Sequence, residues 1–208
     1  MLVAVNGSYD LFQDNLWWMV SAKWSSVLIV LALLWILFHK NRRHALLMIT
    51  MLVLVIAIAD QVSSGIIKAV VERLRPTHDP SLTSVIHIVN GYHGGPYGFV
   101  SSHAANAFAA CTLIALVMRH RLVTLSLAGW AAMQCYSRVY LGVHFPGDIL
   151  GGILVGVLAG WLVWKLMRYI ERRWRLSMAY YSRHDALTIA LAFAITVAAL
   201  ITAALIQL

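Results

Sequence analysis

The sequence predicts an all-α, polytopic membrane protein: a six-helix transmembrane bundle preceded by an N-terminal interfacial helix. Hydrophobic residues make up 61% of the 208 residues and charged residues only 12%, whereas soluble domains average about 45–50% and about 25%. Apolar runs long enough to cross a bilayer alternate with short basic turns. No repeat or low-complexity linker divides the chain, so we expect a single membrane-embedded domain over residues 1–208.

The first expected element is a helix over residues 8–22 that lies in the membrane interface. Its apolar side chains recur on one face, and Trp17, Trp18 and Trp24 suit the headgroup region. The alternative is that this segment extends the first span. No signal peptide is expected, because the N-terminus lacks a basic start and an apolar core with a small-residue cleavage site.

Six apolar segments follow. We expect spans at residues 23–38, 45–59, 104–118, 122–141, from 147 into the basic run 165–175, and 186–208. The second span continues into a polar stripe, since Asp60, Ser64, Lys68 and Arg75 follow helical spacing. Pro76 is expected to end this helix. A polar stripe late in a span indicates a wet pocket or a protein interior.

Three further patterns concern packing and loops. Residues 77–99 form a long polar segment, whose three histidines we expect to be solvent-exposed. Cys111 and Cys135 fall in apolar runs and are expected to be buried thiols, without a disulfide or a metal. Glycines at small-xxx-small spacing in the fifth span predict close helix packing within the bundle. These glycines are Gly147, Gly151, Gly152, Gly156 and Gly160.

The distribution of basic residues predicts the orientation. With six spans, eleven of the 16 Lys and Arg residues fall on one side of the membrane, which the positive-inside rule places in the cytoplasm. Both termini are then extracytoplasmic. Six charged or titratable residues from distant segments also meet at the extracytoplasmic edge: Lys68, Arg75, His103, Arg138, His144 and Asp148.

This set of residues suits an anionic ligand. Arginine contacts phosphate in a bidentate manner, and lysine supplies a compact charge. Ser101 and Ser102 at a helix start add hydroxyl groups, backbone N–H groups and a favourable dipole. His144 precedes Asp148 by four residues, so one ring N–H can be donated to the carboxylate while the other nitrogen stays basic.

The motifs resemble those of the type 2 phosphatidic acid phosphatase family, whose active site is similar to that of vanadium haloperoxidases. Residues 68–76 match its Lys-x6-Arg-Pro motif, and residues 137–148 match Ser-Arg-x5-His-x3-Asp. These motifs delimit a core over residues 68–148. The middle motif, Pro-Ser-Gly-His, matches only at Ser101 and His103, because Val100 replaces the proline and Ser102 the glycine. Turn geometry there is the open question.

The resemblance implies a role for each residue. His144 is the nucleophile that forms a phosphohistidine, Asp148 orients it, and His103 protonates the leaving oxygen and then activates water. No metal and no other cofactor is implied. The phosphoryl group is held by the cations Lys68, Arg75 and Arg138, by the hydroxyl group of Ser101 and by the backbone N–H of Ser102.

The expected function is metal-independent hydrolysis of a membrane lipid phosphate or diphosphate at the periplasmic face of a bacterial inner (cytoplasmic) membrane. The family's substrates include undecaprenyl diphosphate, lipid A phosphates, phosphatidylglycerophosphate and phosphatidic acid; the sequence leans towards the first two. The expected partners are the lipid substrate and the bilayer. Nucleic acid is not expected, because no basic and aromatic patch lies on a soluble module. The oligomeric state is left open.

Two alternatives remain at this point. A phosphotransferase would use the same intermediate and an alcohol in place of water. A transporter or binding protein would use the polar stripe at Asp60, Gln61 and Ser64, although residues 45–59 offer no polar continuation across the membrane. Haloperoxidase activity is disfavoured, because those relatives are soluble and this chain is not.

Overall fold

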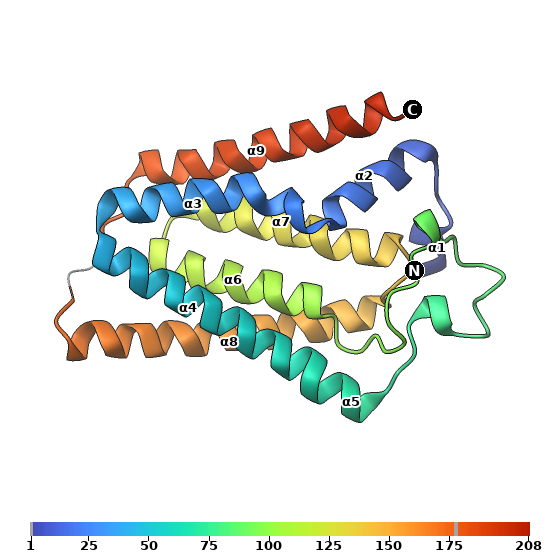
Figure 1. Ribbon diagram of the computed structural model, residues 1–208, viewed down its shortest axis with the longest axis horizontal. Helices are drawn as coiled ribbons and strands as arrows, with labels where there is room; N and C mark the ends of the chain where they lie inside the picture. The colour runs from blue at the N-terminus through green and yellow to red at the C-terminus, as the bar shows by residue number, and fades with distance from the viewer. Residues whose placement is uncertain (1, 177–178) are drawn as a thin grey trace.

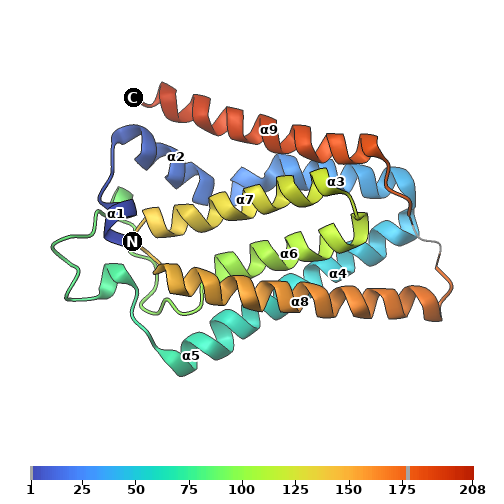
Figure 2. The same cartoon turned by 180° about the vertical axis from the view of Figure 1, so that it is seen from behind.

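The computed structural model describes residues 2–176 and 179–208, and all named secondary-structure elements in these residues are helices. The long helices run side by side along the longest axis, as Figures 1 and 2 show from opposite faces. Both termini lie at the same end of the bundle as the long connection before α6. The α-helices are α1 Leu2–Asn6, α2 Leu11–Ser21, α3 Val27–Lys40, α4 Arg42–Asp60, α5 Lys68–Val71, α6 Ser102–Met118, α7 Arg121–Tyr140, α8 Pro146–Arg173 and α9 Arg183–Ile206.

Four helical stretches are long and apolar enough to cross a membrane: Lys23–Lys40, Arg42–Val71, Pro146–Arg173 and Arg183–Ile206. The helix α6 is apolar but shorter, with 17 residues. Large apolar side chains cover the outside of the bundle; Trp35, Val53 and Leu150, for example, are 65–70% exposed. Such a surface suits lipid, so the chain is an all-helical membrane protein.

The glycines of α8 bring this helix into close contact with α6. A Cβ atom added at Gly152 or Gly156 would meet the carbonyl oxygens of Ser101 and Ala105, and one added at Gly160 would lie 2.7 Å from Thr112 Cβ. The predicted close packing is therefore confirmed for these positions. Its consequence is that the start of α6, with its two serines, lies against the start of α8.

The second span ends differently from the prediction. The α4 helix passes into a π-helical segment at Gln61–Ile67 and stops at Val71, because Glu72 adopts a left-handed conformation with φ 48°. Pro76 is therefore not the residue that ends this helix, and Arg75 does not lie on it. Arg75 belongs to an extended segment, where its backbone N–H donates to the Pro96 carbonyl at 2.9 Å.

The helix predicted over residues 8–22 is present as α2, and the short helix α1, which was not predicted, precedes it. Asp10 caps α2 by accepting a hydrogen bond from the Gln13 backbone N–H at 2.8 Å. The fully buried Asn6 closes α1, and its Nδ2 donates to the carbonyls of His87 (2.8 Å) and Tyr140 (2.7 Å). The N-terminus is thereby tied to the long loop and to the end of α7.

The loop histidines are not all exposed as expected. The His87 side chain is only 22% exposed; it stacks on Tyr9 and its Nε2 lies 2.8 Å from Asp14 Oδ2. His93 is exposed, and His78 is half-buried against it. The expectation failed for His87 because the N-terminal helices pack over this loop, which the local sequence does not reveal.

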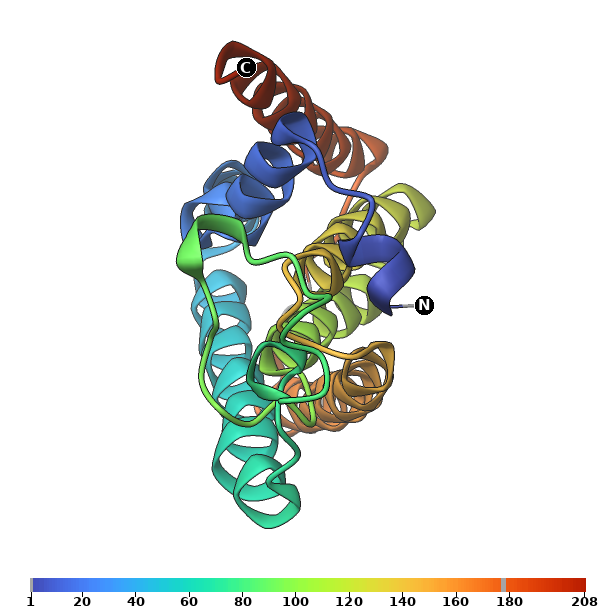
Figure 3. The same ribbon diagram turned by 90° about the vertical axis from the view of Figure 1, so that its right-hand side faces the viewer.

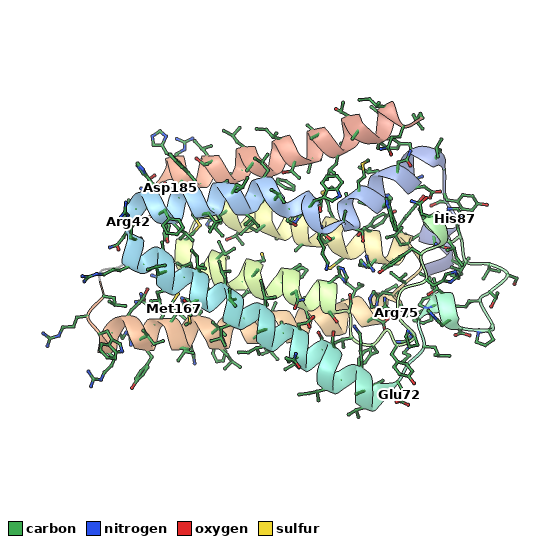
Figure 4. The ribbon with its side chains drawn as sticks, viewed as in Figure 1. Arg42, Glu72, Arg75, His87, Met167 and Asp185 are labelled. Carbon is green, nitrogen blue, oxygen red and sulfur yellow. The ribbon has the colours of Figure 1, made fainter. Side chains whose placement is uncertain are left out.

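Ion pairs join the helices at the opposite end of the bundle. Lys40 Nζ lies 2.9 Å from Asp185 Oδ2, and the buried His44 Nε2 lies 3.5 Å from Glu171 Oε1. Figure 4 shows Arg42 and Asp185 at this end and Arg75 and His87 at the other. Both cysteines are buried and free, as predicted.

Candidate active site

The turn between α7 and α8 fixes a histidine on a carboxylate. Gly142, with φ 69°, allows the turn, and Pro146 starts α8 so that Asp148 lies in its first turn. Asp148 Oδ2 accepts a hydrogen bond from the Phe145 backbone N–H at 2.8 Å and lies 3.4 Å from His144 Nδ1. Both side chains are buried, with 1% of His144 and none of Asp148 exposed.

Arg75 contacts the other nitrogen of the same imidazole. Its Nη1 lies 3.1 Å from His144 Nε2 and donates to the Val143 carbonyl at 3.2 Å, while its Nε donates to the Tyr97 carbonyl at 3.1 Å. A guanidinium group can only donate. His144 Nε2 must therefore accept, which leaves the ring proton on Nδ1, facing Asp148.

The surroundings keep this imidazole uncharged at neutral pH. Burial lowers the pKa of His144 to about 4; the hydrogen bond with Asp148 opposes this shift, and the positive charges of Arg75 and Arg138 add to it. A neutral imidazole with a lone pair on Nε2 is the form of histidine that can act as a nucleophile.

Asp148 also pairs with a cation that sequence reasoning missed. Arg73 Nη1 lies 3.2 Å from Asp148 Oδ1, and its guanidinium stacks 4.2 Å above the Phe145 ring. The two carboxylate oxygens therefore have different partners, Arg73 on one and the turn with His144 on the other. Arg73 is one of six unspecified positions inside the first motif, so no sequence signal set it apart.

Lys68 is held by the serine that departs from the family pattern. Lys68 Nζ donates to Ser102 Oγ at 2.6 Å, and Ser102 Oγ lies 2.7 Å from Ser64 Oγ. Ser101 is fully buried and caps α6, where its Oγ accepts from the Ala104 N–H at 3.4 Å. Its own N–H donates to the Asp148 carbonyl at 2.9 Å, which joins the starts of α6 and α8.

Arg138 is almost completely buried, with 2% of its surface exposed. Its Nη2 donates to the Tyr92 hydroxyl at 2.9 Å, its Nη1 to the Ser21 hydroxyl, and its Nε has no partner. Within residues 2–176 and 179–208, no carboxylate lies within ion-pair distance of Lys68, Arg75 or Arg138. Three cations close together without an anion form a site for an anionic ligand.

His103 follows the two serines at the start of α6. It is exposed, and it lies within electrostatic reach of Arg138, His144, Arg75 and Lys68. Together with Ser102 it lines a cavity of about 560 Å³ that extends into the bundle. The structure thus places every predicted site residue at one end of the molecule, the end that faces the viewer in Figure 3.

Two details of the arrangement add to the prediction. Ser101 caps its own helix, where its hydroxyl oxygen accepts a hydrogen bond. Two neutral residues, Tyr92 and Ser21, hold Arg138, and neither stands out in the sequence because single Tyr and Ser residues in a loop or a helix end carry no pattern. Over the described residues, no cluster of three or more His, Cys, Asp or Glu side chains could hold a metal ion.

Comparisons with known proteins identify the family. The model of the PAP2 superfamily matches residues 45–172. The chain is 35% identical to a lipid A 4'-phosphatase of Porphyromonas gingivalis over 84% of this chain and 74% of that protein. It is 31% identical to a lipid A 4'-phosphatase of Bacteroides thetaiotaomicron over 83% and 78%.

A solved structure is also similar. The crystal structure of a transmembrane PAP2-type phosphatidylglycerolphosphate phosphatase from Bacillus subtilis superposes with a TM-score of 0.61 and 26% sequence identity. The match covers 81% of this chain and 83% of the other.

Proposed function

Because this chain belongs to the PAP2 superfamily of phosphatases, we propose that it hydrolyses a membrane lipid phosphate through a phosphohistidine on His144. The observation that carries the proposal is that both nitrogen atoms of this imidazole are held by neighbouring side chains. Asp148 lies against Nδ1, and Nε2 faces Arg75, next to the other unpaired cations. A phosphate bound to these cations has its phosphorus atom beside the nucleophilic nitrogen.

The reaction proceeds in two steps. His144 Nε2 attacks phosphorus, and the bond from phosphorus to the lipid oxygen breaks. His103, which takes up a proton when the negatively charged phosphate binds beside it, gives that proton to the departing oxygen. Neutral His103 then removes a proton from water, whose oxygen attacks the phosphohistidine and releases inorganic phosphate. Lys68, Arg75 and Arg138 stabilise the negative charge on the phosphoryl oxygens, which is the main electrostatic contribution to such transfers.

Within the lipid phosphates, a lipid A phosphate is the substrate we propose. The support is that relatives bearing that name align with 83–84% of this chain. The proposal is tested by comparing phosphate release from a lipid A phosphate with release from three other lipids: undecaprenyl diphosphate, phosphatidylglycerophosphate and phosphatidic acid.

We also propose six spans, with α6 and α7 completing the four long apolar helices, and α2 lying in the membrane interface. The active-site end then faces the periplasm across a bacterial inner membrane. The support is the excess of basic residues at the other end, which favours the cytoplasm. A site at headgroup depth lets a lipid enter sideways with its chains still in the bilayer.

The experiment uses purified protein in detergent with EDTA and the panel of lipid phosphates. We expect phosphate release by the wild type and by His39→Ala, a control at the far end of the bundle, and none by His144→Ala. Denaturation in alkali, where phosphohistidine survives, should retain labelled phosphate on the protein. Phosphate release that persists in His144→Ala would refute the nucleophile, and transfer of label to an added lipid alcohol would indicate a phosphotransferase.

A further inference from the structure

The cavity below the active site has apolar walls over most of its length. It lies among α3, α4, α6, α7 and α9 and runs along α6 from His103 to Ile114, which is about 16 Å at 1.5 Å per residue. Its volume of about 560 Å³ falls in the range of ligand-binding cavities. On the proposed function, it continues directly from the leaving-group side of the phosphate.

Two polar side chains interrupt these walls close to the phosphate site. Asn106 lies one helical turn after His103, and its Nδ2 donates to Asp60 Oδ1 at 3.2 Å. Both residues line the cavity. Asp60 also lies one turn before Ser64, which contacts the serine that holds Lys68. This pair is therefore one turn deeper than the phosphoryl-binding groups.

Among the described residues, the one hydrogen bond to the Asp60 carboxylate comes from Asn106 and engages only Oδ1. In the part of the chain that the structure describes, it forms no ion pair, although Lys23 lines the same cavity. Two other polar side chains of the cavity are used by the fold: Gln134 Nε2 donates to the Val20 carbonyl, and Ser26 accepts from Trp130. An ionisable residue at this depth without an ion-pair partner indicates a functional role.

We propose that Asp60, held in place by Asn106, determines specificity by accepting a hydrogen bond from a hydroxyl or amide N–H group of the lipid substrate. This inference rests on the proposed function. A carboxylate needs a donor, and the donor must lie just below the phosphate-bearing part of the lipid. Amide-linked or hydroxylated acyl chains provide such a group. Ester-linked diacyl phosphates and prenyl diphosphates provide none there.

The proposed hydrogen bond predicts that the enzyme prefers lipids that carry a donor over lipids that lack one. A site built to hydrogen-bond a substrate group rejects analogues that lack it, because its own polar group is then desolvated without a partner. We therefore expect the enzyme to prefer the donor-bearing lipid by at least about tenfold in kcat/KM, mainly through KM.

The test uses two matched lipids: dipalmitoyl phosphatidic acid and its analogue with the sn-2 ester replaced by an amide. The variants are Asp60→Leu, which removes the acceptor, and Gln61→Leu, which changes an exposed polar neighbour on the same segment. We expect the amide preference of at least tenfold in the wild type and in Gln61→Leu. In Asp60→Leu the ratio of kcat/KM on the amide lipid to kcat/KM on the ester lipid should fall to about one, with activity on the ester lipid retained.

Each other outcome is decisive. An equal loss on both lipids in Asp60→Leu, or no amide preference in the wild type, overturns the specificity role while leaving the phosphatase proposal intact. If Asp60→Leu does not fold, Asp60→Asn takes its place, because a neutral amide is a weaker acceptor and should reduce the preference. Phosphate release that survives in His144→Ala would instead contradict the proposed function.

Discussion

At the scale of single residues, the feature particular to this chain is the hydroxyl group of Ser102. Where the family pattern has glycine, this serine accepts a hydrogen bond from Lys68 and contacts Ser64. A lysine side chain has several rotatable bonds, so such a contact reduces the rotamer freedom that must be lost on binding phosphate.

We therefore expect Ser102→Ala to lower kcat/KM for the lipid phosphate about three- to tenfold, equivalent to about one hydrogen bond. Steady-state phosphate release measures this effect. Ser8→Ala, which removes an exposed hydroxyl group near the N-terminus, is the control. An unchanged or increased kcat/KM would mean that the serine restrains the lysine unproductively.

The depressed pKa of His144 predicts how stability depends on pH. Its pKa is about 4 in the folded chain and about 6.5 when unfolded. Between these values the unfolded chain binds more protons, so acidification favours unfolding. Stability is full above pH 6.5 and falls by about 2–3 kcal/mol towards pH 4.5.

Thermal unfolding at pH 7 and pH 4.5 measures this contribution by comparing wild type with His144→Asn. The asparagine variant does not titrate, so its melting temperature should fall less on acidification. Equal decreases would show that His144 is not buried in its neutral form.

Several residue contacts lay beyond sequence reasoning. The motifs identified the proposed nucleophile, its carboxylate and the three cations, because their spacing is specific. Arg73, which pairs with the same carboxylate, and Tyr92, which holds Arg138, come from turns whose geometry depends on tertiary packing. A motif names the groups that do the chemistry but omits the groups that position them.

At the scale of helices, the seam between α6 and α8 aligns the site. Its glycines let the two backbones touch, and the Ser101 N–H then reaches the Asp148 carbonyl. This packing was predictable from the small-xxx-small spacing. The helix end at Val71 was not predictable, because the π-helical segment before it and the left-handed Glu72 leave no local signature.

Gly156→Ala tests the seam. The added Cβ meets the Ala105 carbonyl oxygen and lies 2.9 Å from the Ala109 nitrogen, so the backbones must separate. We expect a loss of about 1–3 kcal/mol in stability, seen as a lower melting temperature, and reduced activity. Gly129→Ala in α7 is the matched control, because its Cβ makes an ordinary contact 3.4 Å from Phe193 and alanine favours helix. Equal melting temperatures for both variants would contradict the close-packing account.

At the scale of the whole molecule, the distribution of basic residues is the support for the proposed orientation. The composition predicted a membrane protein and the motif order predicted one shared site, and the structure has both. The packing of the N-terminal helices over the long loop was missed, since it depends on contacts between segments about 80 residues apart.

Orientation is testable with single cysteines in the exposed loops. Ser81→Cys lies in the active-site loop, and Arg43→Cys lies at the exposed start of α4, at the opposite end. A membrane-impermeant maleimide should label the first in cells with only the outer membrane opened, and the second only after the inner membrane is broken. The native cysteines are buried and serve as the unlabelled background. The reverse pattern would place the active site in the cytoplasm.

The position of Asn6 has a consequence for biosynthesis. Its amide nitrogen binds the carbonyls of His87 and Tyr140, which leave the ribosome 81 and 134 residues later. Asn6 therefore cannot complete these hydrogen bonds until the chain has been synthesised past residue 140, so its docking follows the translation of α2 to α7.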